Sequence, residues 1–343
     1  MINPILIEVM RGSLIESRHR GSIAIFDADG APVLALGDVE RSVYPRSAVK
    51  AIQALPLVES GIADRFELTD EEIALTCASH SGEERHTATA ASILAKAKRD
   101  ASYLECGAHW PSGEAASRTL AVTGGRPSAL HNNCSGKHSG FICLSCGLSE
   151  DPKGYVTVGH IVQKMVRGAL ENLTGAPHGE AERGTDGCSI PTYAIPLRAL
   201  ALGFARFGTG NGLPRERRAA ARRIRRAVAQ HPFMVAGTDR FDTKLMECLR
   251  ERVFVKSGAE GVYCAALPEL GYGIALKIDD GTPRASAAVM ASLILRLLPL
   301  SDGERIEVEA LARPVLRNWN GIEVGRVQPA PDVFRSAPKS HDS

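Results

Sequence analysis

Ser47 and Lys50 stand three residues apart in the stretch RSAVK. In a helix, two side chains at this spacing lie on the same face. A serine hydroxyl is a weak nucleophile and needs an adjacent base. A lysine amine can be that base when burial or a neighbouring cation lowers its pKa. The spacing therefore predicts a serine–lysine pair for nucleophilic catalysis, although a serine near an ordinary helix start gives the same short pattern.

A second lysine motif, Lys256-Ser257-Gly258, lies near the other end of the chain, at the end of a predicted strand. An S-x-x-K motif followed by a K-T-G motif is the signature of serine β-lactamases and penicillin-binding proteins. Here K-S-G stands in the place of K-T-G. The order of the two motifs favours a serine acyl-transfer enzyme over two accidental short motifs.

The stretch TCASHS, residues 76–81, places Ser79 beside His80 just after an apolar helical run. Two interpretations of this stretch remain open. Ser81 followed by Glu84 has the spacing of a capping box, which would make the stretch an ordinary helix start. That interpretation does not explain Ser79 and His80, and both are therefore candidate site residues.

Two glycine-rich loops carry cysteines: HNNCSGKHSG, residues 131–140, and GTDGCSIPT, residues 184–192. Such loops hold backbone amides in an open geometry that suits an anion. Cys134 and Cys188 could share a zinc ion, with His138 or Lys137 and water completing four ligands. Lysine is a rare ligand because it must be neutral to bind a metal. Two turns with buried thiols remain the alternative interpretation.

Composition and charge argue against several classes of protein. Hydrophobic residues make up 44% of the chain, and 41 Lys and Arg against 39 Asp and Glu leave a net charge of +2, so no overall charge attracts nucleic acid. Seven arginines within residues 215–226 are expected to form a solvated helix face. We expect no signal peptide and no membrane-spanning segment. Eight cysteines without an export signal favour a reducing cytoplasm.

Strand patterns lie at both ends of the chain and helical patterns lie between them. Alternating apolar residues predict strands over the first 40 or so residues, with a turn at residues 27–30, and three more strands after residue 252. We therefore expect an α+β fold with one antiparallel sheet built from both chain ends, packed helices and an inserted, mostly helical lobe. The expected catalytic domain covers residues 1–330, with a sheet lobe at about 1–45 and 235–330, a helical lobe at about 46–234, and a frayed tail at 331–343.

Five motifs together resemble the L-asparaginase II family, the class 3 or rhizobial type. They are YPRSAVKAIQALP, LTCASHSGEERH, NNCSGKHSG, RGTDGCSIPT and KSGAEGVYCAAL, in this order. The resemblance runs from about residue 5 to residue 325, and the two cysteine loops are its most specific part. It implies a fold similar to that of serine β-lactamases and hydrolysis of L-asparagine to L-aspartate and ammonia in a cytoplasmic homodimer.

The resemblance also implies roles for individual residues. It assigns two serine–lysine pairs, Ser47 with Lys50 and Ser79 with Lys256, and a zinc ion beside the substrate pocket. Asp186 would lie near the metal and hold the α-amino group of the substrate. The residues expected to bind zinc are Cys134, Lys137 and Cys188, and those expected to bind substrate are Arg46, His80, Asn133, Asp186 and Gly187.

Other functions remain open at this stage. A penicillin-type serine esterase, a β-lactamase or a glutaminase would use the same scaffold. A zinc-bound hydroxide that attacks the substrate directly is a second mechanism. A zinc-stabilised RNA-binding protein that uses the arginine helix belongs to a different class, and it predicts salt-dependent RNA binding without amidase activity.

Overall fold

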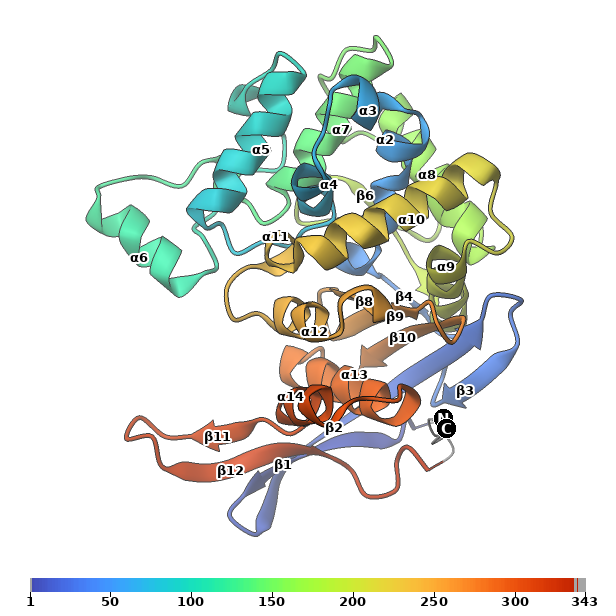
Figure 1. The fold of residues 1–343 in the computed structure, drawn as a ribbon, viewed down its shortest axis with the longest axis vertical. Helices are drawn as coiled ribbons and strands as arrows, with labels where there is room; N and C mark the ends of the chain where they lie inside the picture. Colours follow the sequence, from blue (N-terminus) through green and yellow to red (C-terminus); the bar gives the residue numbers. More distant parts are fainter. Residues whose placement is uncertain (1, 336–337, 339–343) are drawn as a thin grey trace.

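The main sheet of this computed structural model is antiparallel and is built from both ends of the chain (Figure 1). The structure describes residues 2–335 and residue 338. The strand order within them is β11-β12-β1-β2-β10-β9-β8, and β3 pairs with β2. The predicted α+β class, with a sheet from both chain ends, is therefore confirmed. The strands are β1 (Ile5–Arg11), β2 (Leu14–Asp27), β3 (Pro32–Leu36), β8 (Phe254–Ser257), β9 (Val262–Leu267), β10 (Tyr272–Ile278), β11 (Val315–Arg317) and β12 (Glu323–Pro329).

Strand β2 connects the two parts of this sheet. Its first half pairs with β1, and its second half, from Gly21 to Asp27, pairs with β10. It is one continuous strand of 14 residues. Gly21 lies at the changeover, where a Cβ atom would come within 2.3 Å of the Lys277 carbonyl oxygen. Only glycine allows the strands to approach so closely at this point.

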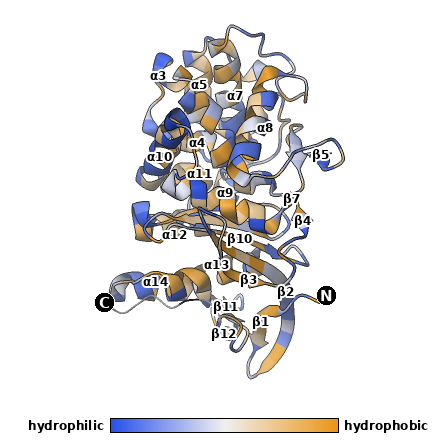
Figure 2. Ribbon diagram, turned by 90° about the vertical axis from the view of Figure 1, so that its right-hand side faces the viewer, coloured by the Kyte–Doolittle hydropathy of each residue, from blue (hydrophilic) through white to orange (hydrophobic). Residues whose placement is uncertain are grey.

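One helix covers each face of the central part of the sheet. Figure 2 shows α9 (Leu197–Thr209) above β10, and α13 (Pro283–Leu297) below it. Both helices are apolar over most of their surface and bury it against the strands. A Cβ atom on Gly273 of β10 would lie 2.0 Å from the Ala201 carbonyl oxygen. The glycine therefore allows α9 to lie directly on the sheet, and α14 (Asp302–Ala312) packs on α13.

The remaining helices lie mostly on the α9 side of the sheet (Figure 1). Short strands also occur among them, where the sequence pattern indicated none: β4 (Ser42–Val43) pairs with β7 (Ile195–Pro196), and β5 (Arg183–Thr185) pairs with β6 (Pro191–Tyr193). The helices are η1 (Arg46–Val49), α1 (Lys50–Gln53), α2 (Leu55–Glu59), α3 (Ile62–Arg65), α4 (Asp70–Thr76), α5 (Glu84–Lys96), η2 (Ala101–Tyr103), α6 (Glu114–Val122), η3 (Ala129–His131), α7 (Ser135–Gly147), α8 (Ile161–Thr174), α10 (Arg215–Gln230), α11 (Pro232–Ala236), α12 (Phe241–Leu249) and η4 (Arg250–Arg252).

The predicted boundaries at 46–234 and 235–330 stay a prediction, and most of the predicted tail at 331–343 lies outside the described residues. Among the helices that the structure describes, none is both long and apolar enough to cross a membrane.

Two local predictions need correction. The apolar pattern from Ser47 to Gly61 predicts one helix, whereas the structure divides this stretch into η1, α1 and α2. Pro56 accounts for the break between α1 and α2, because it has no N–H for a helical hydrogen bond and its ring crowds the preceding turn. The helix that follows TCASHS does not begin at Ser81. Its N-cap is Glu83, and the Ser81 hydroxyl donates to the Ala236 carbonyl at 2.8 Å. The capping-box interpretation of Ser81 and Glu84 is therefore wrong.

Gly258 allows the end of β8 to approach η1 closely, which places Lys256 beside the Ser47 turn. A Cβ atom at residue 258 would lie 2.7 Å from the Pro45 carbonyl oxygen. We expect Gly258→Ala to lower the free energy of unfolding by about 1–3 kcal/mol through this overpacking. Urea unfolding measures the effect.

A matched control for Gly258→Ala is Gly168→Ala, in the exposed middle of α8, where a Cβ atom would meet nothing within 4 Å. We expect this control to raise the stability by about 0.5–1 kcal/mol, because glycine is unfavourable within a helix. Equal effects of the two substitutions would contradict the close approach at Gly258.

Candidate active site

The hydroxyl of Ser79 lies between two buried lysine amines. Lys50 Nζ donates to Ser79 Oγ at 3.0 Å and to the Ala78 carbonyl at 2.5 Å. Lys256 Nζ lies 3.1 Å from the same Ser79 oxygen and 2.9 Å from the Ser257 carbonyl. Both lysine side chains are fully buried, and Ser79 is 8% exposed. One serine oxygen therefore lies within hydrogen-bond distance of two amines.

Three segments far apart in the sequence bring these groups together. Lys50 begins α1, Ser79 follows α4, and Lys256 lies on β8. The loop after α4 is held from both sides by backbone hydrogen bonds. The Ser79 N–H donates to the Val235 carbonyl at 2.9 Å, and the His80 N–H donates to the Asn133 carbonyl at 3.2 Å. These bonds fix the direction of the Ser79 side chain independently of the lysines.

Burial has a large effect on Lys256. It lowers the pKa of this amine from 10.5 to about 8. The nearby Asp242 carboxylate raises the pKa, and the charge of Lys50 lowers it. At mildly alkaline pH a large part of Lys256 is therefore uncharged, which is the form that can accept a proton from a hydroxyl.

Ser47 is half-buried, and among the described residues its hydroxyl takes part in no hydrogen bond. Lys50, its predicted partner, bonds to Ser79 instead. The Ser47 backbone N–H lies in the first turn of η1, where helical N–H groups have no partner within the helix. The structure places Lys256 beside Ser79, as the resemblance implies. The chemical role of both serine–lysine pairs stays a prediction.

The cysteine loops converge as a second cluster next to the first. Lys137 Nζ donates to Cys188 Sγ at 3.1 Å, and the thiols of Cys134 and Cys188 are hydrogen-bonded to each other. The bond from Cys188 keeps the pKa of Cys134 well below its ordinary value; burial opposes this shift, and the charges of Lys50 and Lys137 add to it. Burial alone would lower the pKa of Lys137, but the neighbouring thiols and Asp186 together raise it. The cluster is therefore a buried thiolate–ammonium pair.

Asp186 and Arg46 form an ion pair at the edge of this cluster. Arg46 Nε lies 2.7 Å from Asp186 Oδ1, and the Asp186 side chain is only 8% exposed. Burial raises the pKa of Asp186, but the charges of Lys137 and Arg46 outweigh it and hold the pKa below its ordinary value. Gly187 N–H donates to the same oxygen at 2.8 Å, and a Cβ atom on Gly187 would lie 3.4 Å from the Arg46 guanidinium. Asp186 is thus an ionised carboxylate that is available to a cationic group.

His80 and Asn133 differ in their freedom to bind a ligand. His80 Nδ1 accepts from the Gly82 N–H at 3.1 Å, so Nε2 carries the proton and donates to Ser135 Oγ at 2.9 Å. With both ring nitrogens occupied, binding of substrate by His80 stays a prediction. The half-buried Asn133 side chain makes no hydrogen bond within residues 2–335 and is free to bind a ligand.

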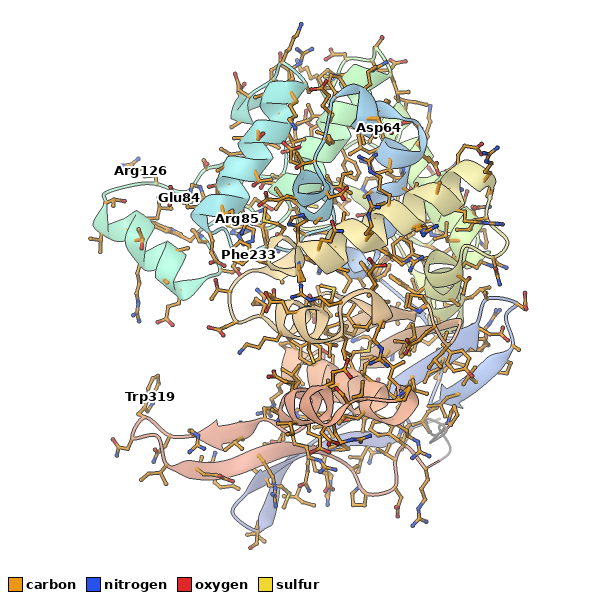
Figure 3. All side chains as sticks on the ribbon, viewed as in Figure 1. Asp64, Glu84, Arg85, Arg126, Phe233 and Trp319 are labelled. Carbon is orange, nitrogen blue, oxygen red and sulfur yellow. The ribbon has the colours of Figure 1, made fainter. Side chains whose placement is uncertain are left out.

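The His80 ring also belongs to a stack that joins the site loop to α5 and α11. It stacks on His86 with ring centroids 5.0 Å apart, and His86 stacks on Phe233 at 4.5 Å. Arg85 covers Phe233 at 5.5 Å, and Figure 3 shows these two residues where α5 meets α11. The stack stabilises the loop that carries Ser79.

Comparison with known proteins decides the family. The sequence model of the family described as L-asparaginase II matches residues 7–329, which include every site residue named above. The chain belongs to the L-asparaginase II family. The suspected resemblance is therefore confirmed. A search of the curated proteins found no match.

Solved structures similar to this L-asparaginase II family member are distant from it. A β-lactamase from Mycobacterium bovis aligns with a TM-score of 0.41 and 11% identity, over 80% of this chain and 93% of its own. A protein named Mglu aligns with a TM-score of 0.36 and 17% identity, over 84% of this chain and 69% of its own.

The donor atoms of the cysteine cluster fit zinc in type. Thiolate sulfur and amine nitrogen are zinc ligands, and Cys134, Cys188 and Lys137 bring two sulfurs and one nitrogen into contact. Within the described residues no group of three His, Cys, Asp or Glu side chains could hold a metal ion. A zinc site here would therefore need Lys137 as its third ligand, and the zinc stays a prediction.

Sequence reasoning missed one group close to the lysines of this family member. Asp242, on α12, has a fully buried carboxylate whose Oδ2 atom lies 3.9 Å from Lys256 Nζ. It stands alone in the stretch FDTKL, which resembles any helix start with an acidic residue. The K-S-G motif, whose serine hydroxyl bonds to Asp242 at 2.7 Å, gave no indication of this partner.

Buried histidines make the stability of this protein sensitive to mild acid. Burial holds the pKa of His80 well below its ordinary value, so the unfolded chain takes up a proton below about pH 6.5 that the folded state does not. Stability is therefore lost as the pH falls. We expect His80→Gln to make that loss shallower by up to about 1.4 kcal/mol per pH unit.

Urea unfolding between about pH 7 and pH 5 measures this slope. His231→Gln serves as the control, since the His231 ring is half-buried and makes no hydrogen bond among the described residues. A slope that is the same in the wild type and in His80→Gln would show that His80 is not held neutral by burial.

Proposed function

We propose that this chain hydrolyses L-asparagine to L-aspartate and ammonia through an acyl-enzyme on a serine. The observation that carries the proposal is the contact of the Ser79 oxygen with the amines of Lys50 and Lys256, at 3.0 and 3.1 Å. A serine becomes a nucleophile when an adjacent base takes its proton. Membership of the L-asparaginase II family supports an amide as the bond that is broken.

Acylation begins with the transfer of the Ser79 proton to the uncharged amine of Lys256. The Ser79 oxygen then attacks the side-chain amide carbon of asparagine, and negative charge develops on the amide oxygen. The free Ser47 N–H and the unpaired Asn133 side chain are the proposed donors to that oxygen. Lys50, which donates to Ser79, stabilises the serine oxygen as it loses its proton.

The leaving group departs with the proton that Lys256 took up. When the carbon–nitrogen bond breaks, Lys256 returns this proton to the leaving nitrogen and ammonia forms. Water then attacks the β-aspartyl ester while the same amine takes a proton from the water. When the ester bond breaks, that proton goes back to the serine oxygen, and aspartate and free enzyme result. One lysine thus serves as base and acid in both half-reactions.

We propose that the ion pair of Asp186 and Arg46, at the edge of the site, recognises the substrate. Free asparagine carries a positive α-ammonium group, and Asp186 presents an ionised carboxylate that is held by Arg46. We propose that Asp186 binds the α-ammonium, with Gly187 leaving room for it. His80 acts through its backbone and ring contacts by holding the Ser79 loop.

We further propose that Cys134, Lys137 and Cys188 hold one zinc ion, with Lys137 in its neutral form. A bound zinc ion supplies a fixed positive charge that orients a polar substrate. The chain's own serine and lysines supply the nucleophile and the base, so the reaction sequence needs none from the metal. We also propose a cytoplasmic location and a homodimer, which the family resemblance implies.

Replacement of the two serines tests the assignment. We expect Ser79→Ala to lower kcat for ammonia release from asparagine by about 10³-fold or more, because among the described residues no other hydroxyl bonds to both amines. Ser47→Ala keeps the backbone N–H and should cost less. Assays with L-glutamine and with nitrocefin, a chromogenic β-lactam, measure the glutaminase and β-lactamase alternatives on the same preparations.

The opposite order, with Ser47→Ala inactive and Ser79→Ala active, would assign the attack to Ser47, the serine first indicated by the sequence motif. Nitrocefin turnover without ammonia release from asparagine would contradict the proposed function. Activity that survives full removal of zinc by a chelator would agree with the assisting role of the metal and would exclude a zinc-bound hydroxide as the nucleophile.

The proposed role of Lys256 as the base predicts how the activity depends on pH. Because the uncharged form of Lys256 is required, kcat/KM for asparagine should rise with pH and level off above about 8, the pKa of this amine. Lys256→Arg should be inactive throughout, since a guanidinium keeps its proton. A wild-type profile that is flat between pH 6 and 9 would rule out Lys256 as the base.

A further inference from the structure

Asp242 lies beside Lys256, and each of its two carboxylate oxygens accepts a hydrogen bond. Its Oδ2 atom accepts from the Ser257 hydroxyl at 2.7 Å and lies 3.9 Å from Lys256 Nζ. Its Oδ1 atom accepts from the Tyr263 hydroxyl. The carboxylate therefore has a donor on each oxygen and a cation beside it, and it is 2% exposed.

Burial of a carboxylate is unfavourable unless other groups stabilise its charge. A carboxylate removed from water costs several kcal/mol unless hydrogen bonds and an opposite charge compensate. Here the donors come from β8 and β9, the two strands that position the K-S-G motif. The hydrogen bonds fix the carboxylate at a point 3.9 Å from the Lys256 amine, within ion-pair distance.

We propose that Asp242 is a positioning residue of the reaction, which holds the Lys256 amine beside the Ser79 oxygen and sets how readily that amine takes up a proton. This inference rests on the proposed function for its catalytic meaning. Lys256 Nζ lies 3.9 Å from the Asp242 carboxylate and 3.1 Å from the Ser79 oxygen.

Several charged and titratable groups from different elements surround the Lys256 amine and affect its pKa. Among the groups that act most strongly on this amine, the Asp242 carboxylate opposes the effects of burial and of the neighbouring cations Lys50 and Arg240. The surrounding groups are Lys50, Cys77, Cys134, Arg240, Asp242 and Cys264. Loss of the carboxylate should therefore make Lys256 harder to protonate.

Two substitutions should shift the pKa of Lys256 in opposite directions. Asp242→Asn keeps the shape and can keep the bonds to Ser257 and Tyr263, but it removes the charge, so the rise of kcat/KM with pH should move to lower pH. Tyr263→Phe keeps the charge and removes one donor from it, so the rise should move to higher pH. In Asp242→Asn we expect kcat to fall about 10-fold to 100-fold through misplacement of the amine, with little change in KM.

The experiment is the pH dependence of asparagine hydrolysis by the full chain, together with an NMR titration of isotope-labelled lysine in which Lys256→Arg identifies the signal. Glu8→Gln is the matched control, since it also removes the charge of a buried carboxylate. Glu8 lies on β1 and pairs with Arg18 at 3.2 Å, not with a lysine of the site. We expect Glu8→Gln to leave both profiles unchanged.

An unchanged pH profile and an unchanged Lys256 titration in Asp242→Asn would overturn the inference, as would shifts of the same direction in Asp242→Asn and Tyr263→Phe. If Asp242→Asn does not fold, Tyr263→Phe decides alone through the direction of its shift. If the wild type releases no ammonia from asparagine, the proposed function fails, and the lysine titration still decides whether Asp242 controls the charge of Lys256.

Discussion

Two lysine amines, both removed from water, share one serine oxygen, and the surrounding groups compensate for the cost of that contact. With each nitrogen about 3 Å from Ser79 Oγ, the two lie at most about 6 Å apart, and two like charges at that separation repel by about 3 kcal/mol at an effective dielectric constant near 20. The protein relieves this repulsion in two ways. Burial favours the uncharged form of Lys256, and the Ala78 carbonyl and the Cys134 thiolate face Lys50.

This arrangement depends on close approaches of the backbone that only small residues permit. Gly258 brings the end of β8 against the Pro45 carbonyl, and Gly237, with φ of 113°, turns the chain between α11 and α12. A Cβ atom on Gly237 would lie 2.4 Å from Glu83 Oε1, the same carboxylate oxygen that accepts from the Thr238 N–H. The turn therefore ties the Ser79 loop to the start of α12, and Asp242 reaches Lys256 from that helix. The geometry of the amines is thus fixed by loops that lie outside the motifs themselves.

The sequence predicted the parts of this site that are local in the chain. Periodic apolar residues identified β8, β9 and β10, and the motif order identified the family. The sequence could not show that Lys50 bonds to Ser79 rather than to Ser47, because a spacing of three residues says nothing about a loop that arrives from after α4. Pro56 divided a helix that its apolar pattern made continuous. Asp242 was missed since its partners, Ser257 and Tyr263, come from strands that are distant in the sequence.

Lysines in this one site have different acid–base properties because their neighbours differ. Lys137 faces two thiols and Asp186, and these raise its pKa against the effect of burial. Lys256 faces a single carboxylate and another lysine, and burial prevails, so its pKa falls to about 8. The charge on Lys50 also lowers the pKa of Cys134, so the serine cluster and the cysteine cluster are electrostatically linked through this side chain. A change of charge at the thiols therefore alters the electrostatic environment of Lys50, which donates to the serine oxygen.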